Sequence, residues 1–164
     1  RSKSIQTTPA HQLALAAVYY SPLQYMYWYD KPSDSQDEPE LKFFDDVYTT
    51  WDDTKGLQGE VGEFITIARR KGEEWFIGSI TNNEKRVLSV SLDFLPEGKN
   101  YIAEIYTDGD KSVKTRTKVR VSTYRVSNKT KLNFCLKASG GAAVRLVPDD
   151  GNIKSVKNYK QQRL

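Results

Sequence analysis

The sequence predicts a mainly β protein, in which an antiparallel β-sandwich follows an α-helical N-terminal segment. After residue 63, apolar and polar side chains alternate along short runs that turn residues separate, and this rhythm is typical of antiparallel sandwiches. Residues 1–60 hold 5 Lys/Arg and 10 Asp/Glu, whereas residues 61–164 hold 20 and 11. Both changes indicate a boundary near residue 60. The expected parts are a helical segment, a sandwich and a frayed basic tail, at residues 1–60, 61–150 and 151–164.

The first helix is predicted to begin at Thr8-Pro9, because threonine can cap free N–H groups and proline is well tolerated in the first turn. Ser21-Pro22 repeats this signal and is expected to restart the helix over residues 23–30. That second segment is apolar almost all round, so we expect it to be buried on more than one side. A polar loop, a short capped helix over residues 41–47 and an irregular link then lead to the strands.

A β-hairpin is predicted where two β-rich runs, residues 64–68 and 75–80, are joined through Lys71-Gly72. Glycine accepts the positive φ that a tight turn needs. Later strands are predicted from alternation alone. They are expected at residues 88–94, 101–106, 113–121, 132–137 and 144–146.

The composition limits the chemistry of the chain. Its 164 residues are enough for one domain with a proper core. The single cysteine, Cys135, excludes an internal disulfide and is expected to be a buried free thiol, and the single histidine, His11, argues against a histidine-rich metal cluster. No apolar run approaches the length of a membrane span. We therefore expect neither a metal site nor a membrane segment.

Few residues suggest a catalytic or binding site. Adjacent carboxylates on a strand point to opposite faces and are poorly placed to flank a sugar, so we expect no catalytic residue. The basic run 111–131 is interpreted as the solvated face of a strand, with a phosphate-binding stripe beside Tyr124 as the alternative. No nucleic-acid signature accompanies this run, and Trp51 is the candidate for carbohydrate stacking. The acidic pairs considered are Asp45-Asp46, Asp52-Asp53 and Glu73-Glu74.

Several segments together resemble the C-terminal end of glycoside hydrolase family 97. They read HQLALAAVYYSPLQ, DKPSD, EPE, TTWDDTK and IARRKGEEWFIGSITN, and the resemblance runs from Thr8 to Pro148. Members of this family are α-glucosidases and α-galactosidases of Bacteroides-type bacteria. The resemblance implies that residues 11–29 correspond to the last helices of a catalytic (β/α)8 barrel and that a β-sandwich closes the chain.

The resemblance also implies what this chain lacks. The catalytic carboxylates and calcium ligands of the family lie upstream of the segment resembled here, and no position in this sequence matches them. A complete barrel of about 250 residues does not fit in 164 residues. The upstream barrel is therefore an expected partner, no cofactor is expected in this segment, and the family implies a periplasmic or secreted location.

Two functions from different classes are compatible with the sequence. The first is a non-catalytic C-terminal portion of a family 97 glycoside hydrolase, which serves packing or oligomerisation of an enzyme acting on α-linked glucosides or galactosides. The alternative is a free-standing β-sandwich module that binds carbohydrate or a polyanion.

The apolar helical segment predicts an interface. Without a barrel it would expose several large side chains, which soluble monomers rarely tolerate. We expect it to pair with a second copy in a homo-oligomer, and docking onto the chain's own sandwich is the second possibility. The residues expected at this interface are Leu13, Ala17, Tyr20, Leu23, Met26, Tyr27 and Trp28.

Overall fold

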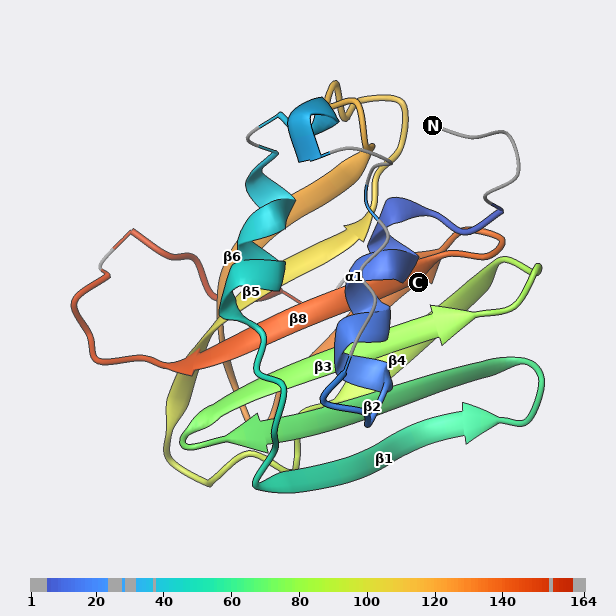
Figure 1. Cartoon of the computed structure of the whole chain (residues 1–164). Helices are drawn as coiled ribbons and strands as arrows, with labels where there is room; N and C mark the ends of the chain where they lie inside the picture. The colour runs from blue at the N-terminus through green and yellow to red at the C-terminus, as the bar shows by residue number, and fades with distance from the viewer. Residues whose placement is uncertain (1–5, 24–27, 29–31, 37, 154, 161–164) are drawn as a thin grey trace.

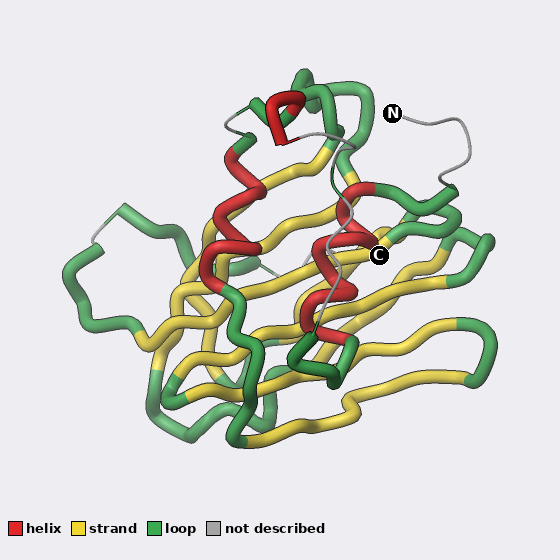
Figure 2. Tube along the Cα trace, viewed as in Figure 1, coloured by secondary structure: helices red, strands yellow, loops and turns green. Residues whose placement is uncertain are grey.

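The computed structural model of the protein describes residues 6–23, 28, 32–36, 38–153 and 155–160. These residues form three layers: α1 (Pro9–Val18) and α2 (Lys42–Asp46) lie across one face of a six-stranded sheet, and a two-stranded sheet covers the other face (Figure 1). Figure 2 shows the helices gathered on one side of the strands. The predicted mainly β sandwich with an N-terminal helix is therefore confirmed.

Two short 3-10 helices, η1 (Pro32–Asp34) and η2 (Pro39–Leu41), lead into α2. The strands are β1 (Asp53–Glu60), β2 (Phe64–Lys71), β3 (Glu74–Thr81), β4 (Arg86–Ser91), β5 (Asn100–Asp108), β6 (Val119–Ser127), β7 (Lys131–Leu136) and β8 (Gly141–Pro148). The large sheet has the order β1-β2-β3-β8-β5-β6, and β4 pairs with β7 in the small sheet. The pairs between these named strands are antiparallel, as the sequence predicts.

The core between the two sheets follows the predicted alternation. Leu88 of β4 and Phe134 of β7 are cross-strand partners that point inward and are buried against the large sheet. Cys135, predicted to be buried, is exposed instead and lies opposite Val87. Its neighbours Phe134 and Leu136 take the inward positions, and successive residues of a strand point to opposite faces.

The core on the other face forms because α1 lies very close to β3 and β8. The Thr8 side chain accepts a hydrogen bond from the N–H of His11 at 3.2 Å, which caps α1 as predicted. Gly78 of β3 leaves room for the helix, since a Cβ there would lie 2.4 Å from the carbonyl oxygen of Ala14. Gly141 of β8 does the same, since its Cβ would lie 2.6 Å from Cα of His11. The residues that α1 buries are Ala10, Leu13, Ala14, Ala16 and Ala17.

Strand β1 differs from the sequence prediction. Residues 53–60, predicted to be an irregular link, pair with β2, so the boundary expected at residue 60 falls inside the β1–β2 hairpin. This segment reads DTKGLQGE and contains one aliphatic side chain, Leu57. Pairing with β2 holds this strand in the sheet, with a bulge between Gly56 and Gln58. The strand therefore does not need the alternation of apolar side chains that would reveal it in the sequence.

Two expectations for the C-terminal half also differ from the structure. The strand expected over residues 113–121 begins only at Val119, because Lys118 has a φ of 58° that interrupts an extended run. The tail is not frayed at residues 157–159: Arg125 of β6 donates its N–H to the carbonyl of Lys157 and accepts from the N–H of Tyr159, both at 2.9 Å. This segment therefore covers part of the outer edge of β6.

The helix expected over residues 23–30 lies almost wholly outside the described residues, which include only Leu23 and Trp28 of it. The short helix expected over residues 41–47 is confirmed as α2.

Candidate functional site

The C-terminal end of α1 is held by Arg69, a buried side chain that β2 places beneath the helix. Its guanidinium donates to the carbonyl oxygens of Ala17 at 2.6 Å and Val18 at 2.8 Å, and to the hydroxyl of Thr54 at 2.9 Å. The last carbonyls of a helix have no partner within the helix, and a positive charge there favours its dipole. Burial lowers the pKa of Arg69. Arg69 therefore fixes the position at which α1 ends on the sheet.

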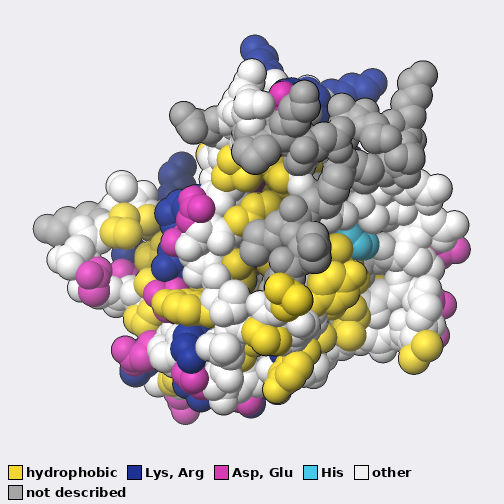
Figure 3. All heavy atoms as spheres, in the orientation of Figure 1, with side chains coloured by type: hydrophobic (Ala, Val, Ile, Leu, Met, Phe, Trp, Pro, Cys, Tyr) yellow, Lys and Arg dark blue, Asp and Glu magenta, His cyan; other side chains and the backbone are white. Residues whose placement is uncertain are grey.

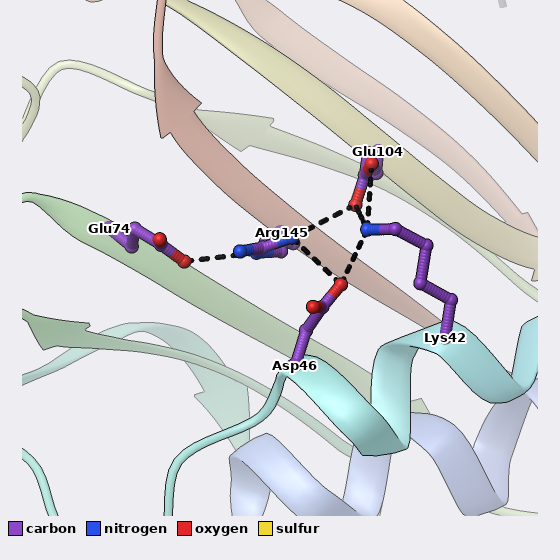
Figure 4. A network of polar contacts seen from close by, with 5 residues as sticks. All are labelled: Lys42, Asp46, Glu74, Glu104 and Arg145. Atoms are coloured by element: carbon purple, nitrogen blue, oxygen red, sulfur yellow. Dashed lines mark hydrogen bonds and ion pairs between the residues drawn. The ribbon is translucent and has the colours of Figure 1, made fainter.

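A network of five charged residues attaches α2 to the same face (Figure 4). Arg145 of β8 lies at its centre and donates to Glu74 of β3 at 2.9 Å and to Asp46 of α2 at 2.7 Å. Lys42 of α2 pairs with Asp46 and, at 3.0 Å, with Glu104 of β5. Burial opposes the charge of Arg145, but the hydrogen bond and charge of Glu74, with the charges of Asp46 and Glu104, raise its pKa. The network ties α2 to three neighbouring strands.

The acidic pairs considered for catalysis are engaged in the fold. Asp46 and Glu74 both bind Arg145. Asp52 accepts a hydrogen bond from the N–H of Gly72 at 2.8 Å, and this bond, together with Lys71, lowers the pKa of Asp52. These carboxylates thus neutralise nearby cations or close a turn, rather than flanking a shared site for a sugar.

The basic run contributes a third attachment. Arg116, interpreted as part of a solvated strand face, pairs with the buried Glu38 at 3.2 Å. Next to it, Thr117 donates to Oε1 of Glu40, a fully buried carboxylate whose Oε2 finds no hydrogen-bond partner in the described part of the chain. These contacts join the loop before β6 to η2, while the Arg116 side chain itself is 47% exposed. Arg120, within β6, is exposed as predicted.

The residues expected at an interface of helices are separated by the structure. Leu13 and Ala17 are fully buried against the chain's own sheet. Helix α1 therefore takes the second of the two arrangements considered, and these two side chains are not available to a second copy. Tyr20 and Leu23, just beyond α1, are 76% and 79% exposed. Hydrophobic side chains gather on this face of the molecule in Figure 3.

Two of the tryptophans pack on the helical side of the large sheet. Trp28 contacts Phe44 edge-on, with ring centres 5.4 Å apart. Trp51, the candidate for sugar stacking, is half-buried with its ring centre 5.5 Å from that of Phe76, and its Nε1 is buried without a hydrogen-bond partner among the described residues. Its ring is thus partly covered by packing against the core on this side of the sheet. Met26 and Tyr27 lie outside the described residues.

A groove beside the β1–β2 hairpin has no counterpart in the sequence analysis. Its volume is about 730 Å³, and it is lined by residues 56–65 and 80–82. Ile65 and Ile80, cross-strand partners on β2 and β3, line it with apolar side chains. Gly56 leaves it open, since a Cβ there would meet nothing within 4 Å. A glycine within an edge strand, Gly56, is the sequence signal that could have indicated a hollow.

Among the residues that the structure describes, no group of three or more His, Cys, Asp or Glu side chains could hold a metal ion. No helix within them is long and apolar enough to cross a membrane.

Fold and surfaces together define a β-sandwich whose charged side chains attach helices to one sheet. Comparison with known families gives the particular one. Residues 50–147 match the family described as glycosyl-hydrolase 97 C-terminal, oligomerisation, and the chain belongs to this C-terminal region of family 97.

Similar proteins are much longer than this chain. It is 34% identical over 142 residues to a retaining α-galactosidase of Bacteroides thetaiotaomicron, an alignment that covers 86% of this chain and 21% of that protein. A family 97 enzyme from Pseudoalteromonas sp. strain K8, solved in complex with acarbose, has 37% identity and a TM-score of 0.78, with coverage of 87% and 23%. A β-arabinopyranosidase at 24% identity and a TM-score of 0.68 shares the fold. The chain spans about a fifth of the length of the curated relative.

Proposed function

We propose that this chain serves as the self-associating, non-catalytic C-terminal part of a family 97 enzyme that hydrolyses α-linked glucosides or galactosides. The observation that carries the proposal is the family match over residues 50–147, a region described by its role in oligomerisation. The substrate class is supported by the similar retaining α-galactosidase and by the similar enzyme solved with acarbose.

The helical layer supports a role as an adaptor between a catalytic domain and the sheet. Arg69 holds the end of α1, and Arg145 holds α2 through Asp46. Both helices are thereby fixed to the sheet, so a domain joined to them would be held in a defined orientation. We infer that the catalytic barrel is this partner and that it contacts the exposed Tyr20 and Leu23.

Catalysis is assigned to residues outside this chain. Asp46 and Glu74 form ion pairs with Arg145, and Asp52 closes a turn by accepting a hydrogen bond from Gly72. The calcium that the family implies is proposed to bind upstream of this chain, on the family relationship alone. A periplasmic or secreted location is proposed on the family relationship alone.

Sedimentation equilibrium of the purified 164-residue chain tests the proposal, together with an assay on p-nitrophenyl α-galactoside and α-glucoside. We expect a dimer or larger assembly and no release of p-nitrophenol above the buffer rate. A chain that stays monomeric through the micromolar range would refute the self-association. Hydrolysis that survives repurification would refute the non-catalytic assignment.

A further inference from the structure

We propose that the β1–β2 hairpin is the contact between two copies of this chain, each placing Val61 in the groove of the other. The inference rests on the proposed function, because it names the surface and the partner of that self-association. The partner is a second copy of the same chain, related by a two-fold axis.

A two-fold contact uses the same patch twice, so that patch must carry both a projection and a hollow. Val61 is the projection: it is fully exposed at the hairpin turn, which Gly62 forms with a φ of 79°. The hollow begins beside it, where Ile65 and Ile80 line the groove and Gly56 has no side chain to fill it. A single exposed valine is ordinary, but a valine that continues into an apolar groove forms a patch of the kind that marks interaction sites.

The other surfaces of the described chain are less suited to a second copy. Residues 157–159 already cover part of the edge of β6, opposite β1 in the large sheet. Helices α1 and α2 already cover one face of that sheet. Tyr20 lies over the guanidinium of Arg69, at 5.3 Å, directly after α1. That face continues the helical layer and suits the catalytic domain to which the helices would be joined.

The contact proposed is the packing of apolar faces rather than the addition of strands. The bulge between Gly56 and Gln58 distorts β1, and a bulge in an edge strand discourages pairing with a further strand. Association through apolar side chains should depend little on salt, since screening weakens only charged contacts. Of the two carboxylates on the rim of the groove, Glu63 is paired with Arg86 at 2.9 Å and Glu60 is exposed.

Four lysine substitutions with the same change in charge test this surface by sedimentation equilibrium of the full chain. Val61→Lys places a charge on the projection, and Gly56→Lys fills the hollow at a position where a Cβ meets no atom within 4 Å. Val87→Lys is the matched control, an exposed valine on the far small sheet. Tyr20→Lys probes the competing helical face. Circular dichroism confirms that each variant is folded.

We expect Val61→Lys and Gly56→Lys each to raise the dimer dissociation constant by at least about tenfold, since each change occurs twice per dimer. Val87→Lys and Tyr20→Lys should leave it unchanged, and so should a rise in salt concentration. If folded Val61→Lys and Gly56→Lys associate as tightly as the wild type, the hairpin is not the contact, although the proposed function stands. A monomeric wild-type chain would overturn both.

Discussion

Replacing Gly78 by alanine should displace α1 from the sheet. The new Cβ would lie 2.4 Å from the carbonyl oxygen of Ala14 and 2.9 Å from Cγ2 of Val18. The oxygen belongs to the helix backbone and cannot rotate away. Ordinary contact begins at 3.4 Å, so α1 would have to move outward by about 1 Å.

The cost follows from two opposing effects. Overpacking a filled core costs about 1–3 kcal/mol. Alanine in place of a strand glycine recovers about 0.5–1 kcal/mol. Because the clash is with backbone, the upper half of the overpacking range applies, and we expect Gly78→Ala to lower the free energy of unfolding by about 1–2.5 kcal/mol.

Urea unfolding, followed by tryptophan fluorescence and circular dichroism, measures this loss. Gly56→Ala is the matched control: it changes a glycine of the same sheet where nothing lies within 4 Å of the new Cβ. It should be neutral or stabilise the chain by up to about 1 kcal/mol. Equal unfolding midpoints for Gly78→Ala and the wild type would refute the close contact between α1 and β3.

Two further predictions concern the ends of α1. Arg69→Met should destabilise the chain by about 2–3 kcal/mol in urea unfolding, because it leaves the buried carbonyls of Ala17 and Val18 without their charged donor. A loss below about 0.5 kcal/mol would contradict the role of Arg69 in holding the end of α1. Burial lowers the pKa of His11, so the unfolded state binds a proton more readily than the folded state does. The contribution of His11 to the free energy of unfolding should therefore be fully present above pH 6.5 and be lost as the pH drops below that value. His11→Asn keeps a donor for the carbonyl of Gly140. It should remove the part of the stability loss between pH 7 and 5 that His11 causes. An unchanged pH profile would exclude His11 as the cause.

The sequence predicts the two-sheet core well because alternation reports burial directly. Leu88 and Phe134 are partners whose inward direction follows from their neighbours. It predicts β1 poorly, since that strand has one aliphatic residue, Leu57, and is held in place by pairing with β2. Pairing leaves no apolar alternation in a strand whose one aliphatic side chain, Leu57, packs against the core.

The position of α1 could be predicted only in part. Its apolar face shows that the helix must be covered but not by what. The missing signal lies in β3 and β8, where Gly78 interrupts an apolar run, Gly141 begins one, and both make room for a helix rich in alanine. Arg69 and Arg145 were not singled out either, because a buried arginine and an exposed one look alike in a sequence.

Hydrogen exchange of the intact chain tests this account most directly. It is measured at protein concentrations below and above the dimer dissociation constant, and it shows whether α1 packs on its own sheet and whether the β1–β2 hairpin contacts a second copy. We predict that the backbone amides of residues 12–18 are protected equally at both concentrations, because β3 and β8 of the same chain cover that helix. Protection of residues 56–65 should instead increase as the chain associates. Amides of α1 that exchange freely at dilution and become protected only on association would contradict this account, because the helix would then be covered by another copy.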